Sequence, residues 1–226
     1  MSYEATRQRL ETYFDRTASR TWEALTSDAP VSKIRQTVRE GRDAMRDTML
    51  SALPSDLTGA RVLDAGCGPG QMAIELALRG ADVVAVDISP SLIDVAAKRT
   101  PDHLANRISY SAGDMLDPKH GTFDAVVAMD SLIHYTAPDI AVAIAGLTAR
   151  TNGPVVFTIA PKTPMLTAMW WAGKVFPKSD RSPAIQPHKT ATIADELRKA
   201  GSKTTLREVG TISRGFYISQ ATEARA

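Results

Sequence analysis

The segment Val62–Gly70, with the sequence VLDAGCGPG, decides how the rest of the chain is interpreted. Its first residues form a short apolar run, which predicts a buried strand over residues 61–65. Glycines follow at alternate positions, and glycine permits a positive φ and a close ligand approach because it has no Cβ. A helical pattern begins directly afterwards, at Gln71. The segment therefore predicts a strand, a tight turn that accommodates a ligand, and a helix.

The spacing of these glycines excludes two phosphate-binding motifs. A dinucleotide fingerprint, G-x-G-x-x-G, would place glycine or alanine where this chain has Gln71. A phosphate P-loop would need G-K-[ST] after the turn, and that tripeptide is absent. Asp64 lies inside the motif, and a carboxylate at this point would repel a pyrophosphate. It suits a ligand that carries a positively charged amino group.

Strand and helix patterns alternate through the rest of the chain. Strands are expected at residues 61–65, 81–87, 107–112, 123–129, 155–160, 203–208 and 215–220, and helices at 3–25, 30–52, 71–78, 90–99, 140–148 and 192–200. Ser89 suits the N-cap of one helix, with Pro90 in its first turn. This alternation predicts βαβ units and an α/β fold with a mainly parallel sheet. Ligands bind outside the carboxyl ends of such strands, so the site is expected in the loops near residues 65–71, 87–90, 113–116, 129–135 and 160–164.

Length and composition set the class of protein. A chain of 226 residues fits one domain over residues 1–226, with a helical arm at 1–55, a Rossmann-like core at 56–226 and an insertion at about 161–190. The 27 basic and 25 acidic residues give a net charge of +2, without the basic face that nucleic acid requires. The single cysteine excludes an internal disulfide and a zinc site built on several thiolates, and no resident metal is expected. No signal-peptide core or apolar stretch of about 18–20 residues is visible, so a cytoplasmic protein is expected, with peripheral membrane contact left open.

Acidic residues follow two further strands at the same edge of the predicted sheet. Asp87 ends the second strand, where a carboxylate can accept hydrogen bonds from both hydroxyls of a ribose. After the third strand, Asp114 is placed to accept a hydrogen bond from the amine of adenine, and Met115 to pack on its ring. Together with Asp64, these residues fit a nucleoside that has a cationic amino-acid tail.

At these residues the chain resembles the class I S-adenosylmethionine-dependent methyltransferases. Their hallmarks are D-x-G-x-G-x-G, the acidic residue that ends the second strand, and the G-D-M after the third. The resemblance implies S-adenosylmethionine as cosubstrate and a mostly parallel seven-stranded sheet with an antiparallel last strand and helices on both faces. The residues expected to bind this methyl donor are Asp64, Gly66, Cys67, Gly68, Asp87, Ile88, Asp114, Met115 and Met129.

Motifs outside the donor loop point to the methyl acceptor. No Asn/Asp-Pro-Pro-aromatic segment follows Met129, and Cys67 lies in the wrong loop to attack cytosine, so a small-molecule acceptor remains. Nearly the whole chain resembles the magnesium-protoporphyrin IX O-methyltransferase family of (bacterio)chlorophyll biosynthesis. The segments that carry the resemblance are Tyr13-Phe14 with Trp22, Leu132–Tyr135, Thr158–Pro164, Arg181-Ser182-Pro183 with Gln186-Pro187-His188, and Ser213–Tyr217. It implies methylation of one propionate of Mg-protoporphyrin IX to give the monomethyl ester.

His134 is the first candidate for a catalytic role in that reaction. It would donate a hydrogen bond that orients the propionate; axial ligation of the Mg²⁺ is the alternative, although magnesium prefers oxygen ligands. Tyr135 and Tyr13 are expected to contact the substrate, with packing as the competing interpretation. His188 is also expected to contact it, and an exposed loop histidine is the competing interpretation there. His120 lies in a polar loop and is expected to be solvated.

The insertion contains the segment 165–176, MLTAMWWAGKVF. Its methionines and tryptophans, among them Trp170, suit contact with a flat macrocycle, although a membrane interface or packing against the sheet would also use them. The family resemblance further implies the porphyrin-carrying subunit of magnesium chelatase as a partner. Two other functions stay open, namely methylation of another apolar small molecule such as a quinone, and a non-catalytic tetrapyrrole-binding module. The intact glycine turn argues against the module.

Overall fold

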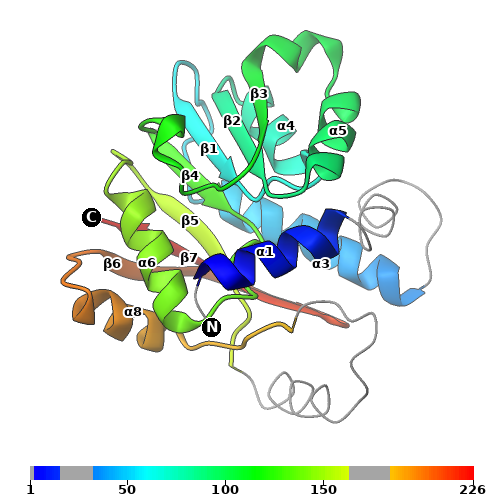
Figure 1. Ribbon diagram of the computed structural model, residues 1–226. Coiled ribbons are helices and arrows are strands. Elements are labelled where there is room, and N and C mark those ends of the chain that lie inside the picture. The colour runs from blue at the N-terminus through cyan, green and yellow to red at the C-terminus, as the bar shows by residue number, and fades with distance from the viewer. Residues whose placement is uncertain (1–2, 16–32, 163–183) are drawn as a thin grey trace.

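The computed structural model describes residues 3–15, 33–162 and 184–226, which form an α/β fold around one sheet (Figure 1). The order of the strands is β3-β2-β1-β4-β5-β7-β6, and β7 runs antiparallel to both of its neighbours while the other pairs are parallel. The strands are β1 (Arg61–Ala65), β2 (Asp82–Asp87), β3 (Ile108–Ala112), β4 (Ala125–Ala128), β5 (Val155–Ile159), β6 (Thr205–Arg214) and β7 (Tyr217–Arg225). The predicted mostly parallel seven-stranded sheet with an antiparallel last strand is confirmed.

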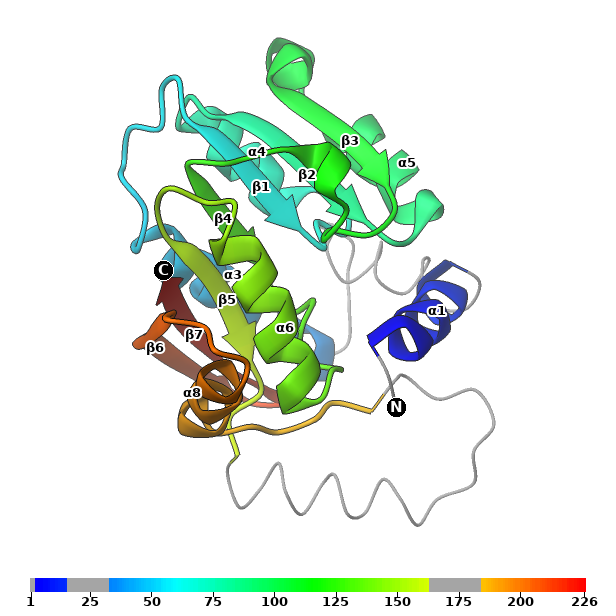
Figure 2. The same cartoon turned by 60° about the vertical axis from the view of Figure 1, so that its left-hand side comes forward.

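Helices cover both faces of this sheet (Figures 1 and 2). They are α1 (Tyr3–Tyr13), α3 (Lys33–Leu50), α4 (Gln71–Leu78), α5 (Pro90–Arg99), α6 (Ala137–Thr148) and α8 (Thr190–Lys199), with short 3-10 turns η2 (Asp102–Arg107) and η3 (Pro118–His120). On one face, α3 and α4 bury Met45 and Leu76 against the sheet. On the other face, α6 and α8 bury Ile144 and Leu197 in a second cluster, which Leu10 of α1 joins. The central strands are therefore buried on both faces, which is why the sequence of each is dominated by apolar residues.

Local capping explains where two helices begin. Ser89 caps α5 as predicted, because its hydroxyl accepts a hydrogen bond from the N–H of Leu92. The helix predicted at 140–148 begins earlier, at Ala137, because the hydroxyl of Thr136 accepts from the N–H of Asp139. The N-terminal helix ends at Tyr13, and the remainder of the helix predicted at 3–25 lies outside the described residues from residue 16 on.

The last two strands are longer than predicted. They form a hairpin that turns after Arg214, and its pairing continues from Arg214↔Tyr217 to Thr205↔Arg225. The predicted ranges, 203–208 and 215–220, were wrong in length because polar residues interrupt the apolar pattern of both strands. Within the described residues, no helix combines the length and the apolar character that crossing a bilayer requires.

The order of the strands decides where a ligand can bind. From β1 the chain moves outward through β2 to β3, and then returns to the other side of β1 to form β4. Strands that leave β1 in opposite directions open a crevice above their carboxyl ends. The loops after β1, β2, β3 and β4 all reach this crevice, as the sequence predicts.

A glycine in the first of these loops tests the close packing at the crevice. Gly66 has a φ of 81°, and a Cβ added to it would lie 2.3 Å from the Cβ of Ser131. We expect Gly66→Ala to lower the free energy of unfolding by more than about 1 kcal/mol. A positive φ is unfavourable for alanine, and its Cβ would overlap the side chain of Ser131. The matched control is Gly146→Ala in α6, where a Cβ meets nothing within 4 Å. This control should stabilise the protein by about 0.5–1 kcal/mol. Urea unfolding followed by circular dichroism measures both, and equal effects would contradict the close packing.

Candidate functional site

A pocket of about 960 Å³, including the part open to solvent, lies above the carboxyl ends of β1, β2 and β4. The predicted residues that line it are Asp64, Gly66, Cys67, Gly68, Asp87, Ile88, Met115, Met129, His134 and Tyr135. The structure thus brings together most of the residues that the sequence nominated. Asp114, Tyr13 and His188 do not line this pocket, and Trp170 lies outside the described residues.

Asp64 places a buried carboxyl group at the floor of the pocket. Strand β1 holds this residue at 1% exposure, and its Oδ2 atom has no hydrogen-bond partner. Burial, together with the charge of the neighbouring Asp87, raises the pKa of Asp64 to about 8. A buried polar atom without a partner is rare in proteins. Here it is explained if a cationic group of a ligand completes the site.

Asp87 is held in place by the backbone of two loops. Its Oδ2 accepts a hydrogen bond of 2.8 Å from the N–H of Gly68, and its Oδ1 accepts one of 2.9 Å from the N–H of Ser89. Burial raises the pKa of Asp87, and these two hydrogen bonds oppose the rise. A carboxylate offers about four acceptor positions, so Asp87 can also accept from a ligand's hydroxyls. Gly68 leaves open space at its Cβ position, and its φ of 51° suits glycine.

Cys67, in the same turn, has a buried side chain, and burial followed by the charges of Asp64 and Asp87 raises the pKa of the thiol well above its ordinary value. Since the thiolate is the reactive form, this environment disfavours a nucleophilic role for Cys67. Cys67 contributes shape to the wall of the pocket.

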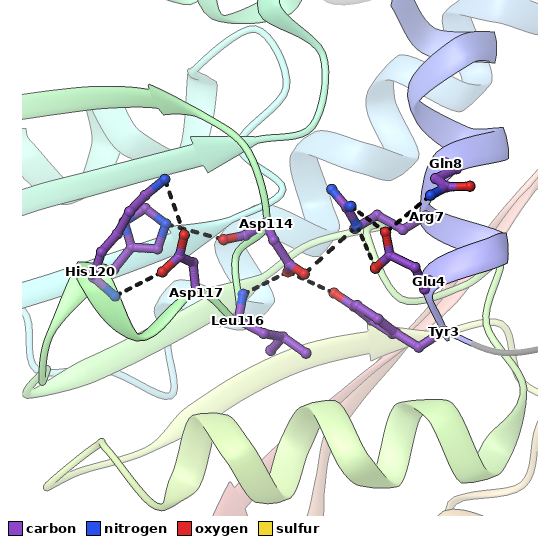
Figure 3. A network of polar contacts seen from close by, with 9 residues as sticks. Tyr3, Glu4, Arg7, Gln8, Asp114, Leu116, Asp117 and His120 are labelled. Atoms are coloured by element: carbon purple, nitrogen blue, oxygen red, sulfur yellow. Dashed lines mark hydrogen bonds and ion pairs between the residues drawn. The ribbon is translucent and has the colours of Figure 1, made fainter.

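Helix α1 reaches the loop after β3 through Tyr3 (Figure 3). The Tyr3 hydroxyl donates a 2.9 Å hydrogen bond to Oδ1 of Asp114, which also accepts one of 2.8 Å from the N–H of Leu116. On its other side, the Asp114 Oδ2 lies 3.8 Å from Nε of Arg7. Burial, then the nearby Tyr135 and Asp114, raises the pKa of Tyr3, so its hydroxyl stays protonated and donates. No local sequence signal links Tyr3 to a residue 111 positions away.

His120 corrects one expectation. It was expected to be solvated, but its side chain is buried and its Nε2 lies 3.1 Å from the carbonyl oxygen of Asp114 (Figure 3). A carbonyl oxygen only accepts, so Nε2 is the donor in this pair. His120 therefore fixes the backbone of Asp114 while Tyr3 fixes its carboxylate.

Aromatic side chains form the wall of the pocket opposite the glycine turn. Tyr3 stacks on Tyr135 with ring centroids 4.9 Å apart, and Phe14 lies 6.1 Å from the ring of His134. Phe14 lines the pocket, whereas Tyr13 packs edge-on against Phe14 at 5.2 Å. In this structure the residue after Tyr13, and not Tyr13 itself, therefore lines the pocket.

The loop that carries His134 is held by the segment after the insertion. The His134 Nδ1 lies 3.5 Å from the carbonyl oxygen of Ala184, and the side chain of Gln186 donates to the carbonyl of His134 at 2.9 Å. The His188 Nε2 donates to the carbonyl of Tyr135, also at 2.9 Å. Burial lowers the pKa of His188, against the opposing effect of this hydrogen bond. In the described structure His188 therefore supports the loop and does not reach the pocket.

Two pocket residues that the sequence did not nominate form a partly buried ion pair. Arg42 of α3 contacts Asp130, which follows β4, and both line the pocket. They are 88 positions apart, and a charged residue on a predicted helix is usually solvated, so the sequence carried no signal for the pair. Among the described residues, no group of three or more His, Cys, Asp or Glu side chains could hold a metal ion.

Comparison with known proteins agrees with this geometry. Residues 62–151 match the family described as "Methyltransferase domain", and residues 128–226 match "Magnesium-protoporphyrin IX methyltransferase C-terminus". The crystal structure of magnesium protoporphyrin IX methyltransferase from Synechocystis PCC 6803 with bound SAH superposes with a TM-score of 0.83 at 30% identity, covering 97% of this chain and 100% of that one. The same enzyme with bound SAM gives 0.77 at 26% identity, with 98% and 97% covered.

The parallel sheet, the glycine turn after β1 and the carboxylate that closes β2 define a class I S-adenosylmethionine-dependent methyltransferase. The Rhodobacter capsulatus protein named "Magnesium-protoporphyrin O-methyltransferase" is 57% identical over 225 residues, which are 99% of this chain and 98% of that protein. The chloroplastic enzyme of Arabidopsis thaliana is 30% identical and shares 94% of this chain and 69% of its own length. The chain belongs to the magnesium-protoporphyrin O-methyltransferase family.

The raised pKa of Asp64 predicts how stability depends on pH. The folded protein binds this proton more tightly than the unfolded chain, so the group's contribution to stability is complete below about pH 4 and is lost as pH rises through about 8. Each unit of separation between the two pKa values corresponds to about 1.4 kcal/mol. We expect Asp64→Asn to unfold with a weaker pH dependence than the unsubstituted protein between pH 5 and 8.5, and to be the more stable of the two at the upper end. Parallel slopes in urea titrations would contradict a buried, protonatable Asp64.

Proposed function

We propose that this chain transfers the methyl group of S-adenosylmethionine to a propionate carboxylate of Mg-protoporphyrin IX. The observation that carries the proposal is the 57% identity to the Rhodobacter capsulatus protein, which extends over 99% of this chain. The geometry supports it because buried carboxylates and an aromatic wall lie in the same pocket. The buried carboxylates would hold the methyl donor, and the aromatic wall would hold an apolar acceptor beside it.

The donor is assigned to the floor of the pocket. The unpartnered oxygen of Asp64 would receive the ammonium group of its amino-acid tail, and the fixed carboxylate of Asp87 would accept from the ribose hydroxyls. Gly66 and Gly68 would allow close approach of the tail, while Ile88, Met115 and Met129 would enclose the nucleoside. When bound, S-adenosylmethionine supplies an electrophilic methyl group on a positively charged sulfur.

The acceptor needs orientation more than activation. A propionate titrates near pH 4–5, so at neutral pH it is ionised and requires no general base. Holding it in line with the methyl group is the main task, and correct orientation can contribute up to about 7–11 kcal/mol to catalysis. The attacking charge is neutralised in the transition state, which makes exclusion of water favourable. The wall of Tyr3, Phe14 and Tyr135 would exclude that water.

His134 is the proposed orienting residue for the propionate. It is buried, lines the pocket and follows β4, at the edge of the sheet where donor and acceptor meet. A ring nitrogen of His134 would donate the hydrogen bond that orients the propionate. Tyr135 is proposed to contact the macrocycle beside it.

Contacts with partners remain proposals of the same kind. The porphyrin-carrying subunit of magnesium chelatase would deliver a poorly soluble substrate. The segment 165–176, which contains Trp170, would contact either the macrocycle or a membrane surface. Co-sedimentation with anionic vesicles, with and without residues 165–176, distinguishes these uses of the segment. Binding that survives its removal would exclude it as the membrane contact.

The proposed reaction is tested by incubating the purified protein with labelled S-adenosylmethionine and saturating Mg-protoporphyrin IX. We expect a labelled monomethyl ester, and we expect Asp87→Asn to bind the donor at least about tenfold more weakly because a charged hydrogen-bond acceptor is lost. Asp82→Asn is the matched control, since Asp82 begins the same strand and its side chain is 68% exposed. Faster turnover of a quinone hydroxyl would favour another acceptor. Binding of the porphyrin without any product would favour a carrier.

Tyr3→Phe tests whether α1 takes part in recognition of adenine. It removes the hydroxyl that orients the Asp114 carboxylate, while the ring that stacks on Tyr135 stays. We expect the protein to discriminate less between S-adenosylhomocysteine and its inosine analogue, which lacks the exocyclic amine, because one fixed hydrogen bond is worth about 0.5–1.5 kcal/mol. Calorimetry measures both affinities. If both ligands weaken by the same factor, Tyr3 only closes the pocket.

A further inference from the structure

Asp130 has a backbone conformation that its neighbours must enforce. Its φ is 56°, and among the described residues it is the one non-glycine residue with a positive φ. Such conformations are unfavourable for residues with a side chain and are concentrated at functional sites. Thr158 of β5 holds this one, because its hydroxyl accepts from the Asp130 N–H at 2.7 Å and donates to the Asp130 Oδ1 at 3.3 Å.

The carboxylate of Asp130 is bound from two other elements. Arg42 of α3 forms an ion pair with Oδ2, and the hydroxyl of Tyr217, at the start of β7, lies 3.1 Å from Oδ1 and 3.3 Å from Oδ2. The Asp130 side chain is 7% exposed and that of Arg42 is 14% exposed. Burial, then the charge of Asp130, raises the pKa of Tyr217, so its hydroxyl is a permanent donor. Contacts from three elements, β5, α3 and β7, therefore converge on Asp130, and its carboxylate holds the Arg42 guanidinium.

This guanidinium belongs to the wall of the pocket. Arg42 and Arg46 are the cationic side chains among the described residues that line it, and Arg46 is bonded to Asp43 at 2.7 Å. In the same wall, the Oγ atom of Ser131 is buried and has no hydrogen-bond partner. A guanidinium carries five N–H donors in a planar fork that matches a carboxylate. A guanidinium and an unpartnered hydroxyl that line the same pocket can together recognise an anion with two oxygens.

We propose that Arg42 binds a carboxylate of a ligand in this pocket, and that Asp130 is the positioning residue that holds Arg42 for it. The inference rests on the proposed function, which brings two carboxylates into the pocket, the α-carboxylate of the methyl donor and the propionate of the acceptor. Asp64, Asp87 and Asp130 also line the pocket, so either carboxylate would be repelled without a cation in its wall. Ser131 would add a second hydrogen bond to the same group.

The experiment compares each ligand with a version that lacks the carboxylate. The donor pair is S-adenosylhomocysteine and its decarboxylated analogue, and the acceptor pair is Mg-protoporphyrin IX and its dimethyl ester. Affinities are measured by calorimetry for the donor pair and by absorbance titration for the acceptor pair. Arg42→Gln removes a charged hydrogen-bond donor. We therefore expect one of the two carboxylate ligands to bind at least about tenfold more weakly, while its analogue that lacks the carboxylate binds with unchanged affinity. Whichever pair responds identifies the carboxylate that Arg42 holds.

The role of Asp130 is tested in combination with Arg42. Asp130→Asn keeps the shape but removes the charge, and we expect it to reduce the same carboxylate preference by a smaller factor. If Asp130 acts through Arg42, the double variant Arg42→Gln, Asp130→Asn loses no more preference than Arg42→Gln alone. The double variant also removes both charges of the pair, so it leaves no unpaired buried carboxylate if the single variant fails to fold.

Two results would overturn the proposal. One is unchanged affinity of the double variant for both carboxylate ligands. The other is an equal loss for the ligands with and without a carboxylate, which would show that Arg42 and Asp130 only shape the pocket. The labelled-methyl assay with the unsubstituted protein separates failure of this proposal from failure of the proposed methyl transfer. It measures the reaction itself, whereas the affinity comparisons measure only how Arg42 and Asp130 contribute to binding.

Discussion

The two hydrogen bonds that Asp87 accepts from backbone N–H groups are the contact on which the site depends. They join the glycine turn after β1, through Gly68, to the start of α5, through Ser89. The carboxylate therefore satisfies two backbone donors and is fixed by them at the same time. Asp64 lies close by with an unpartnered oxygen, and its pKa of about 8 keeps this buried carboxyl largely protonated at neutral pH in the absence of a ligand. A cationic group placed beside it would favour the ionised form, so the site we assign to the ammonium tail of the methyl donor would gain its charge when the donor binds.

Local chemistry was sufficient to predict much of this molecule from its sequence. The turn at residues 66–70 is governed by glycine geometry, the start of α5 by the cap at Ser89, and strands β1, β2, β4 and β5 by burial. Each of these leaves a pattern within a few residues. Strand β7 left a weaker pattern, because its buried positions include Gln220 and Glu223. Their polar groups are satisfied by Thr190 and by two arginines, partners that no local reading of the strand reveals.

The candidate site shows the same division between near and distant partners. The residues of the loops after β1, β2 and β4 were predicted to share a pocket, and they line one, although their roles toward the donor and acceptor stay predictions. Tyr3 and Arg42 were missed because their partners, Asp114 and Asp130, are 111 and 88 positions away. His120 was judged by the polarity of its loop, whereas its burial follows from the hydrogen bond to the carbonyl of Asp114.

The place of β7 between β5 and β6 has a consequence for how the protein is made. Asp130 and Arg42 leave the ribosome long before Tyr217, the residue of β7 that completes their cluster. Until residues 217–225 have been synthesised and inserted beside β5, the nascent chain has an open sheet edge at β5 and a pocket wall without one of its donors. Contacts this distant in sequence form late in folding and leave apolar strand edges exposed in the meantime. The growing chain is therefore expected to depend on chaperones most strongly just before translation of this final hairpin.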